Sequence, residues 1–207
     1  MRDKILTGLS RFISMALNPL LMPTYACFLV LWVSVLCAQP VGGRAMVLVV
    51  VACLTCMIPM MTVGTLHHFH FVRDKQLNSA RERRIPYVVT LVCLVAAALY
   101  LHYHHAPLWF TMVPVGMAVS CLLLGVVNLW WKVCVHTAGV AALVAMLVQV
   151  HVQGLSAFNL LYLIVATVML TGMVGTSRMV LGRSTLGQVV AGVALGYAPV
   201  AVAMLLS

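Results

Sequence analysis

The sequence predicts an all-α integral membrane protein built as a single bundle of about seven transmembrane helices. Hydrophobic residues make up 64% of the 207 positions and charged residues only 7%, which leaves too little polar surface to coat a water-soluble globule. The apolar residues fall into separate runs, each near the roughly 20 residues that a helix needs to cross the hydrocarbon. The sequence lacks the residue alternation typical of a membrane β-barrel, so helices must satisfy the backbone hydrogen bonds.

The first apolar run, residues 15–38, follows a segment that we expect to lie in the headgroup region. In this segment, residues 1–14, apolar side chains recur at helical spacing opposite basic ones, which suits a short interfacial helix; a frayed tail is the alternative. The residues of the two faces are Ile5, Leu9 and Phe12, and Arg2, Lys4 and Arg11. The run is long and has no clear small-x-small cleavage site, so we interpret it as a retained span rather than a signal peptide.

Six further apolar runs complete one transmembrane domain, residues 15–207. They cover residues 44–66, 86–104, 107–130, 133–152, 156–176 and 187–206. The prolines expected to kink these helices or widen their packing are Pro59, Pro114 and Pro199. On the last run, Gly192 and Gly196 stand four residues apart, which allows a neighbouring helix to approach closely.

Counting spans places eleven of the twelve Lys and Arg residues on one membrane face, with Arg44 as the exception. This face carries the N-terminus and residues 67–85, 130–135 and 177–186. The positive-inside bias assigns it to the cytoplasm, and we expect the protein in a bacterial inner membrane. Arginines that bind a ligand do not report topology, so the independent support for this orientation comes from Arg2, Lys4 and Arg11.

The formal net charge of +9 indicates an anionic partner. Only three acidic residues, Asp3, Asp74 and Glu82, accompany the twelve cations. Nucleic acid is not expected, because the basic residues occupy short loops and no soluble domain is present to dock a duplex. Anionic or phosphate-bearing lipids are the natural counterparts, and the charge imbalance at one face predicts an anion site.

Three separate stretches supply the cations of this predicted site. The loop HHFHFVRDKQLNSARERRIPY contains Arg81, Arg83 and Arg84, whose guanidinium groups suit phosphate; a solvated loop that fixes topology is the alternative. In NLWWKVCVHTAG, Lys132 and His136 are four residues apart at a helix start and are expected on the same helix face. A histidine just inside the membrane is unfavourable without a polar role or partner, and a purely structural role is the alternative.

The third stretch, GTSRMVLGRSTLGQ, contains Ser177, Arg178 and Ser184 between the last two spans. The order of the stretches, an arginine-rich loop before a proline, a histidine at a helix start and then Ser-Arg, resembles the type-2 phosphatidic acid phosphatase superfamily. That family's motifs are a Lys followed six residues later by Arg-Pro; Pro-Ser-Gly-His; and Ser-Arg, five residues, His, three residues, Asp. The resemblance covers residues 67–200 and implies a six-helix core, residues 44–206, with the first span as an addition.

Residue by residue, the resemblance is partial. Ser177 and Arg178 fit the third motif, and QVVAGVALG is similar to the family's usual continuation. Ser184 stands at the position of the nucleophilic His, and Gln188 at that of the orienting Asp. His136 fits the second motif in a form, K-x-x-x-H-x-x-G, that resembles a divergent branch without Pro-Ser-Gly. The first motif has one residue inserted between Arg and Pro, so which loop arginine takes the phosphate is open.

In the family, the third-motif His attacks phosphorus, the second-motif His protonates the leaving oxygen, and Arg and Lys stabilise the phosphate oxygens. Without that His and Asp, we expect the phospho-histidine route to be closed, whereas the phosphate-holding residues are retained. The resemblance implies that these are Lys132, Ser177, Arg178, Arg81, Arg83 and Arg84.

The sequence therefore predicts a membrane protein that binds a phosphate-bearing lipid or an isoprenyl pyrophosphate, with membrane-protein partners as a further expectation. Two alternatives stay open. One is an active lipid phosphatase with rearranged catalytic residues, in which His136 attacks, or activates Ser184 or water. The other is a purely structural subunit of a membrane complex. No cofactor is expected, and no metal, because the histidine clusters at residues 67–70 and 102–105 have no fixed carboxylate or Cys alongside.

Overall fold

The computed structural model describes residues 8, 10, 12–68, 80–156 and 158–207, and within this range the side chains of residues 66–84 are left aside. Most of the predicted interfacial segment, residues 1–14, lies outside the described residues. The described chain is helical and contains no strand, and seven of its helices are long and apolar enough to cross a membrane. The all-α membrane fold predicted from the sequence is confirmed.

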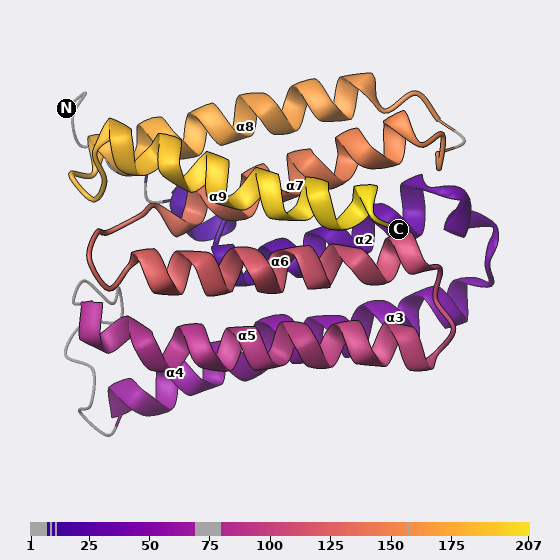
Figure 1. Ribbon diagram of the computed structural model, residues 1–207, viewed down its shortest axis with the longest axis horizontal. Coiled ribbons are helices and arrows are strands. Elements are labelled where there is room, and N and C mark those ends of the chain that lie inside the picture. Colours follow the sequence, from indigo (N-terminus) through magenta and orange to yellow (C-terminus); the bar gives the residue numbers. More distant parts are fainter. Residues whose placement is uncertain (1–7, 9, 11, 69–79, 157) are drawn as a thin grey trace.

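The long helices run side by side along one axis (Figure 1). They are α2 (Met22–Val33), α3 (Val41–Ala52), α4 (Ile58–His68), α5 (Ala80–Tyr103), α6 (Leu108–Val127), α7 (Val135–Val152), α8 (Leu161–Val180) and α9 (Leu186–Leu205). Helices α3 and α4 belong to one span, Val41–Thr65, so these eight helices make seven spans. Figure 1 shows the α6–α7 and α8–α9 connections at the same end of the bundle as the end of α4 and the start of α5. We call this end the basic end, because Lys132 lies in the first connection and Arg183 in the second.

Helix α7 is the centre of the bundle. Every side chain from Val140 to Leu147 is buried, and the helix packs against α9, α8 and α2. A Cβ atom added to Gly192 would lie 2.5 Å from the Cys134 carbonyl oxygen, and one added to Gly196 would overlap the Ala138 carbonyl. The close approach predicted from the glycine spacing is therefore confirmed, because only a hydrogen atom fits between α9 and the α7 backbone.

The first apolar run differs from the single helix expected over residues 15–38. A helical turn ends near Leu17, and the short 3-10 helix η1 (Pro19–Leu21) precedes α2. The Asn18 side chain accepts a hydrogen bond from the Leu20 N–H (3.2 Å) and caps η1. Pro19 has no backbone N–H with which to continue the preceding turn, so the chain bends at this point.

The second run is interrupted at the position predicted from its proline. A short π-helix, η3 (Cys53–Met57), joins α3 to α4, which begins one residue before Pro59. Proline removes an N–H donor and its ring crowds the carbonyl four residues earlier, here that of Thr55. The Thr55 hydroxyl donates to the Val51 carbonyl (2.8 Å). Because of this interruption, α3 and α4 are two helices rather than one continuous helix.

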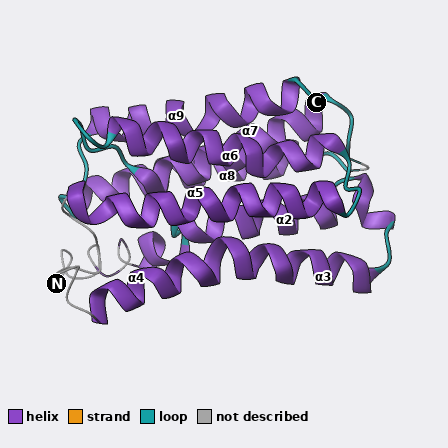
Figure 2. Cartoon of the chain, turned by 60° about the horizontal axis from the view of Figure 1, so that its bottom comes forward, coloured by secondary structure: helices purple, strands orange, loops and turns teal. Residues whose placement is uncertain are grey.

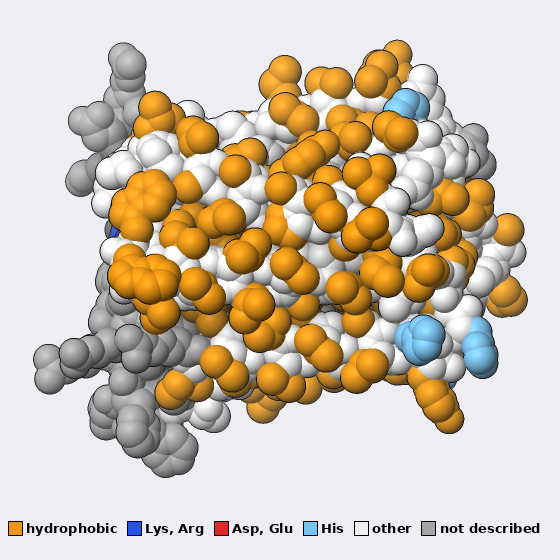
Figure 3. All heavy atoms as spheres, in the orientation of Figure 1, with side chains coloured by type: hydrophobic (Ala, Val, Ile, Leu, Met, Phe, Trp, Pro, Cys, Tyr) orange, Lys and Arg blue, Asp and Glu red, His pale blue; other side chains and the backbone are white. Residues whose placement is uncertain are grey.

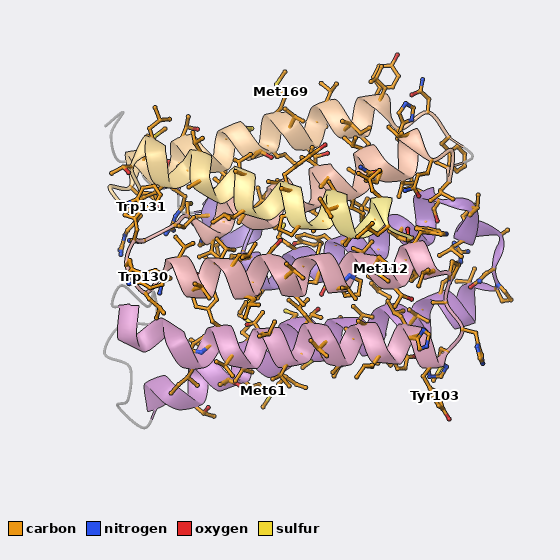
Figure 4. The ribbon with its side chains drawn as sticks, viewed as in Figure 1. Met61, Tyr103, Met112, Trp130, Trp131 and Met169 are labelled. Carbon is orange, nitrogen blue, oxygen red and sulfur yellow. The ribbon has the colours of Figure 1, made fainter. Side chains whose placement is uncertain are left out.

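The surface of the bundle suits a bilayer. Apolar side chains cover the flank seen in Figure 3. Trp130 and Trp131 lie at the basic end and Tyr103 at the opposite end (Figure 4). All three side chains are exposed, and amphipathic aromatics at both ends are typical of membrane–water interfaces.

Arg44, the cation that the sequence places on the opposite face, is buried in that end of the bundle. Its guanidinium lies 5.1 Å from the centre of the Trp32 ring and donates a hydrogen bond to the Leu31 carbonyl (3.2 Å). Stacking on an aromatic face and a carbonyl acceptor both favour a buried guanidinium. Arg44 therefore has a local structural role.

Candidate functional site

A cavity of about 980 Å³ opens at the basic end of the bundle. Residues from the first span, α4, α5, α6, α7, α8 and both connections of the basic end line it. The basic side chains among the described lining residues are Lys132, His136, Arg178 and Arg183. They come from the α6–α7 connection, α7, α8 and the α8–α9 connection, so the fold brings sequence-distant cations to one space.

Lys132 and His136 line the cavity from different elements. Helix α7 begins at Val135, so His136 lies in its first turn, whereas Lys132 precedes the helix. The prediction that both residues share one helix face is therefore wrong. Lys132 lies in the loop and His136 in the helix, and both line the same cavity. The Cys134 N–H donates to the Gln188 carbonyl of α9 (3.1 Å), which holds the end of this connection extended.

The turn after α8 places Arg183 and Ser184 in the cavity wall. The Arg183 N–H donates to the Arg178 carbonyl (3.0 Å) and the Gly182 N–H to the Met179 carbonyl (2.9 Å). Gly182 has a φ of 63°, a left-handed conformation that glycine adopts without strain. This pair of bonds around a left-handed glycine is the Schellman motif, which ends a helix and reverses the chain sharply.

Arg178 occupies the last turn of α8, where the helix dipole favours a cation. Its Nη1 atom donates a hydrogen bond to the Ser14 hydroxyl (3.1 Å). The His136 imidazole interacts with the Ser14 backbone and lies close enough to Arg178 to experience its charge. The turn before η1 therefore covers the basic side chains, and Ser14 belongs to the site. Sequence reasoning missed Ser14, because a lone serine at the end of the predicted interfacial segment carries no motif.

Two residues of the third motif stretch have structural partners. The Ser177 hydroxyl donates to the Met173 carbonyl of its own helix (2.7 Å), and Ser177 does not line the cavity. Gln188, at the position of the family's Asp, forms a capping box with Thr185, whose N–H donates to the Gln188 Oε1 atom (3.1 Å). A capping box satisfies N–H groups at the start of a helix that otherwise have no partner. Gln188 thus contributes to the start of α9.

Ser184 lines the cavity, and its hydroxyl oxygen is buried without a hydrogen-bond partner among the described residues. His136 and Ser184 are both described, so they lack the hydrogen bond that would pair a serine nucleophile with its base. The cavity therefore holds several basic side chains and the Ser184 hydroxyl, which no neighbouring imidazole activates.

The predicted loop arginines fall on the first turns of α5. Arg81, Arg83 and Arg84 lie in this helix, and their side chains are outside the described part of the chain. Pro86 and Tyr87, two and three residues after Arg84, line the cavity. The helix that carries these arginines therefore borders the site.

Within the described residues, no group of three or more His, Cys, Asp or Glu side chains is placed to hold a metal ion. The exposed histidines His102, His104 and His105 lie at the end opposite the basic end, and residues 69–70 of the other histidine cluster are outside the described range. No known family, curated protein or solved structure matches this chain. The resemblance to the phosphatase superfamily stays a prediction from its motifs.

Proposed function

We propose that this membrane protein binds the phosphate of a lipid phosphate or an isoprenyl pyrophosphate at the basic end of its cavity and does not hydrolyse it. The observation that carries the proposal is the meeting of Lys132, His136, Arg178 and Arg183 on one cavity at one end of an apolar bundle. Basic side chains at an interface, next to an apolar space, suit a ligand with a phosphate head and a hydrocarbon tail.

The chemistry of these residues supports phosphate as the ligand. Arginine presents several N–H donors in a planar fork that matches two phosphate oxygens, and lysine adds a compact charge. The first turn of α7, with Val135 and His136, also lines the cavity. A helix start carries a partial positive charge that favours a bound anion.

The geometry around Ser184 supports binding rather than turnover. Hydrolysis through a serine nucleophile needs a base in hydrogen-bond contact with the hydroxyl, and His136 does not supply that contact. Gln188, which has no carboxylate, is engaged in the capping box of α9. We therefore expect the bound phosphate ester to remain intact.

Ligand binding to the full chain in lipid nanodiscs tests the proposal, with dioleoyl phosphatidic acid and farnesyl pyrophosphate as probes. Arg178→Ala is expected to weaken binding by about tenfold or more, because a hydrogen bond to a charged group contributes about 1.5–3 kcal/mol. Arg178→Lys should recover part of the loss, since it restores the charge without the paired donors. Arg44→Gln, which removes a cation from the opposite end, is the control and should bind like the wild type once thermal melting shows that it is folded.

Phosphate release from the same probes separates the alternatives. The wild type is expected to release none. Release that disappears in His136→Ala would show an active phosphatase and overturn the proposed binder. A folded wild type that binds neither probe would instead favour a purely structural subunit, and unchanged binding in a folded Arg178→Ala would show that Arg178 does not hold the phosphate.

A further inference from the structure

The cavity continues far beyond the basic side chains. Along α6, its lining runs from Leu124 to Met117. Met117 lies ten residues from Val127, where α6 ends, which is about 15 Å along the helix axis. On α5 the lining extends to Leu94. Because the hydrocarbon of a bilayer is about 30 Å thick, the cavity reaches from one interface to near the midplane.

The deep part of the cavity is apolar and has a defined floor. Its innermost lining includes Pro23, Leu94, Met117 and Ala142. Met117 and Pro23 also line a second void of about 10 Å³, which has room for one water at most and extends toward Phe110. These two side chains therefore separate the main cavity from the next space in the bundle.

One side of the cavity faces the bilayer. Met15, before η1, and Met60, on α4, both line the cavity and are nevertheless 72% and 58% exposed. Helix α4 packs against α5, and any contact between α4 and α2 is marginal. Figure 2 shows α3 and α4 along one edge of the bundle. Among the described residues, Met15 and Met60 thus form the rim of an opening toward lipid.

We propose that this cavity is a tail chamber that admits a lipid phosphate sideways from the bilayer and measures the length of its hydrocarbon tail at Met117. The inference rests on the proposed function, which places the phosphate at Arg178 and the other basic side chains. The ligand class is a phosphate or pyrophosphate ester whose tail spans about one leaflet. Its charged head and apolar tail match the two ends of the cavity.

The chamber acts through fit rather than through hydrophobic attraction. A tail that leaves the bilayer for the cavity exchanges one apolar surrounding for another, so the transfer itself supplies little affinity. A tail that is too long meets the floor, and packed interiors resist added volume. Met117, an unbranched and adaptable side chain, is the floor residue whose size is simplest to change.

The test compares geranyl, farnesyl and geranylgeranyl phosphate, with dioleoyl phosphatidic acid as a separate arm, for binding to the full chain in nanodiscs. Met117→Trp should raise the floor and weaken the longest isoprenyl tail it meets by about tenfold, while geranyl phosphate stays within about twofold. Met117→Ala should join the two voids and shift the preference toward longer tails. Met169→Trp and Met169→Ala, at an exposed position of α8, are matched controls and should keep the wild-type profile.

The outcomes distinguish this inference from the proposed function. If Arg178→Ala removes binding of every probe while the Met117 variants keep the wild-type length profile, the tail chamber is wrong and the phosphate site stands. If the wild type binds none of the probes, both fail. Should Met117→Trp not fold, Leu94→Trp places the same bulk on the facing helix and is expected to give the same loss of long tails. Binding of phosphatidic acid alone would identify a diacyl ligand, and binding of isoprenyl phosphates alone a prenyl ligand.

Discussion

At the scale of single residues, Ser184 and Gln188 carry the difference between holding a phosphate and cleaving it. Ser184 lines the cavity beside the basic side chains, yet its hydroxyl has no hydrogen-bond partner among the described residues. Gln188 sits one helical turn further on, where its side chain caps α9. An alcohol without a base and an amide in place of a carboxylate leave the site with donors for phosphate oxygens and no activated nucleophile.

The double variant Ser184→His and Gln188→Asp is expected to gain phosphate release from a lipid phosphate. The new His would lie in the cavity wall, and an Asp in the first turn of α9 remains compatible with the helix start. Gln188→Asp alone is the control and should release no phosphate. A double variant that binds the lipid as the wild type does but releases nothing would show that the third stretch does not have the family's catalytic geometry.

Ser14→Ala is expected to weaken binding of farnesyl pyrophosphate by about two- to tenfold, because the variant removes the acceptor that orients the Arg178 guanidinium. Ser14→Thr, which keeps a hydroxyl, should restore most of the affinity. Ser156→Ala is a matched control, since this hydroxyl donates to the Val33 carbonyl at the opposite end (2.8 Å). Equal affinity of Ser14→Ala and the wild type would exclude a positioning role for Ser14.

At the scale of elements, the packing of α9 on α7 sets the shape of the basic end. The two helices touch through Gly192 and Gly196, and the Cys134 N–H bond to Gln188 continues the contact into the α6–α7 connection. The glycine spacing predicted this approach. It did not predict that α7 would be the central helix, because α7 and its neighbours are apolar all round and no polar face shows which helix is innermost.

Gly196→Ala is expected to lower the stability of the folded bundle by about 2 kcal/mol or more, since its methyl group would overlap the Ala138 backbone. Gly172→Ala, on α8, is the matched control: an added Cβ there meets nothing within 4 Å, and replacing a helical glycine should be neutral or slightly stabilising. Unfolding of both variants in mixed micelles measures the difference. Equal unfolding midpoints for Gly196→Ala and Gly172→Ala would contradict the close α7–α9 contact.

Some helix boundaries can be predicted from local sequence patterns. The turn after α8 has its signals in the chain, a glycine at the left-handed position and Thr185 followed three residues later by Gln188. The π-helix before Pro59 follows from the proline. The bend at Asn18 was missed, because it occurs inside an apolar run whose average hydropathy hides the break. The connection at residues 130–135 was predicted, but the start of α7 at Val135 leaves Lys132 outside the helix face that it was expected to share with His136.

At the scale of the whole molecule, the seven spans put the basic end on one side of the membrane and the C-terminus on the other. The aromatic residues at the two ends are consistent with a membrane interface at each end (Figure 4). Arg44, buried against Trp32, does not oppose the charge bias because it is held within the bundle. The charge bias still predicts that the basic end faces the cytoplasm.

Thiol labelling of the chain in intact inverted and right-side-out vesicles tests this orientation. Trp130→Cys, at the basic end, is expected to react with a membrane-impermeant reagent from the cytoplasmic side, and Tyr103→Cys only from the other side. Both positions are strongly exposed. The wild-type chain, with its seven cysteines, supplies the background. Labelling of both variants from the same side would contradict the span count, and the reverse pattern would invert the orientation.

The sequence by itself determined that this is an apolar membrane bundle, its helical class and the number of its spans, because these follow from composition and run length. It also predicts that the cations gather at one membrane face. Only the tertiary structure decided that Lys132, His136, Arg178 and Arg183 line one cavity, that Ser14 lines it beside Arg178 and that Ser177 does not. It also decided that the cavity extends to Met117. The physical reason is that nearly every span is apolar all round, so hydropathy places each helix in the membrane but not beside a particular neighbour.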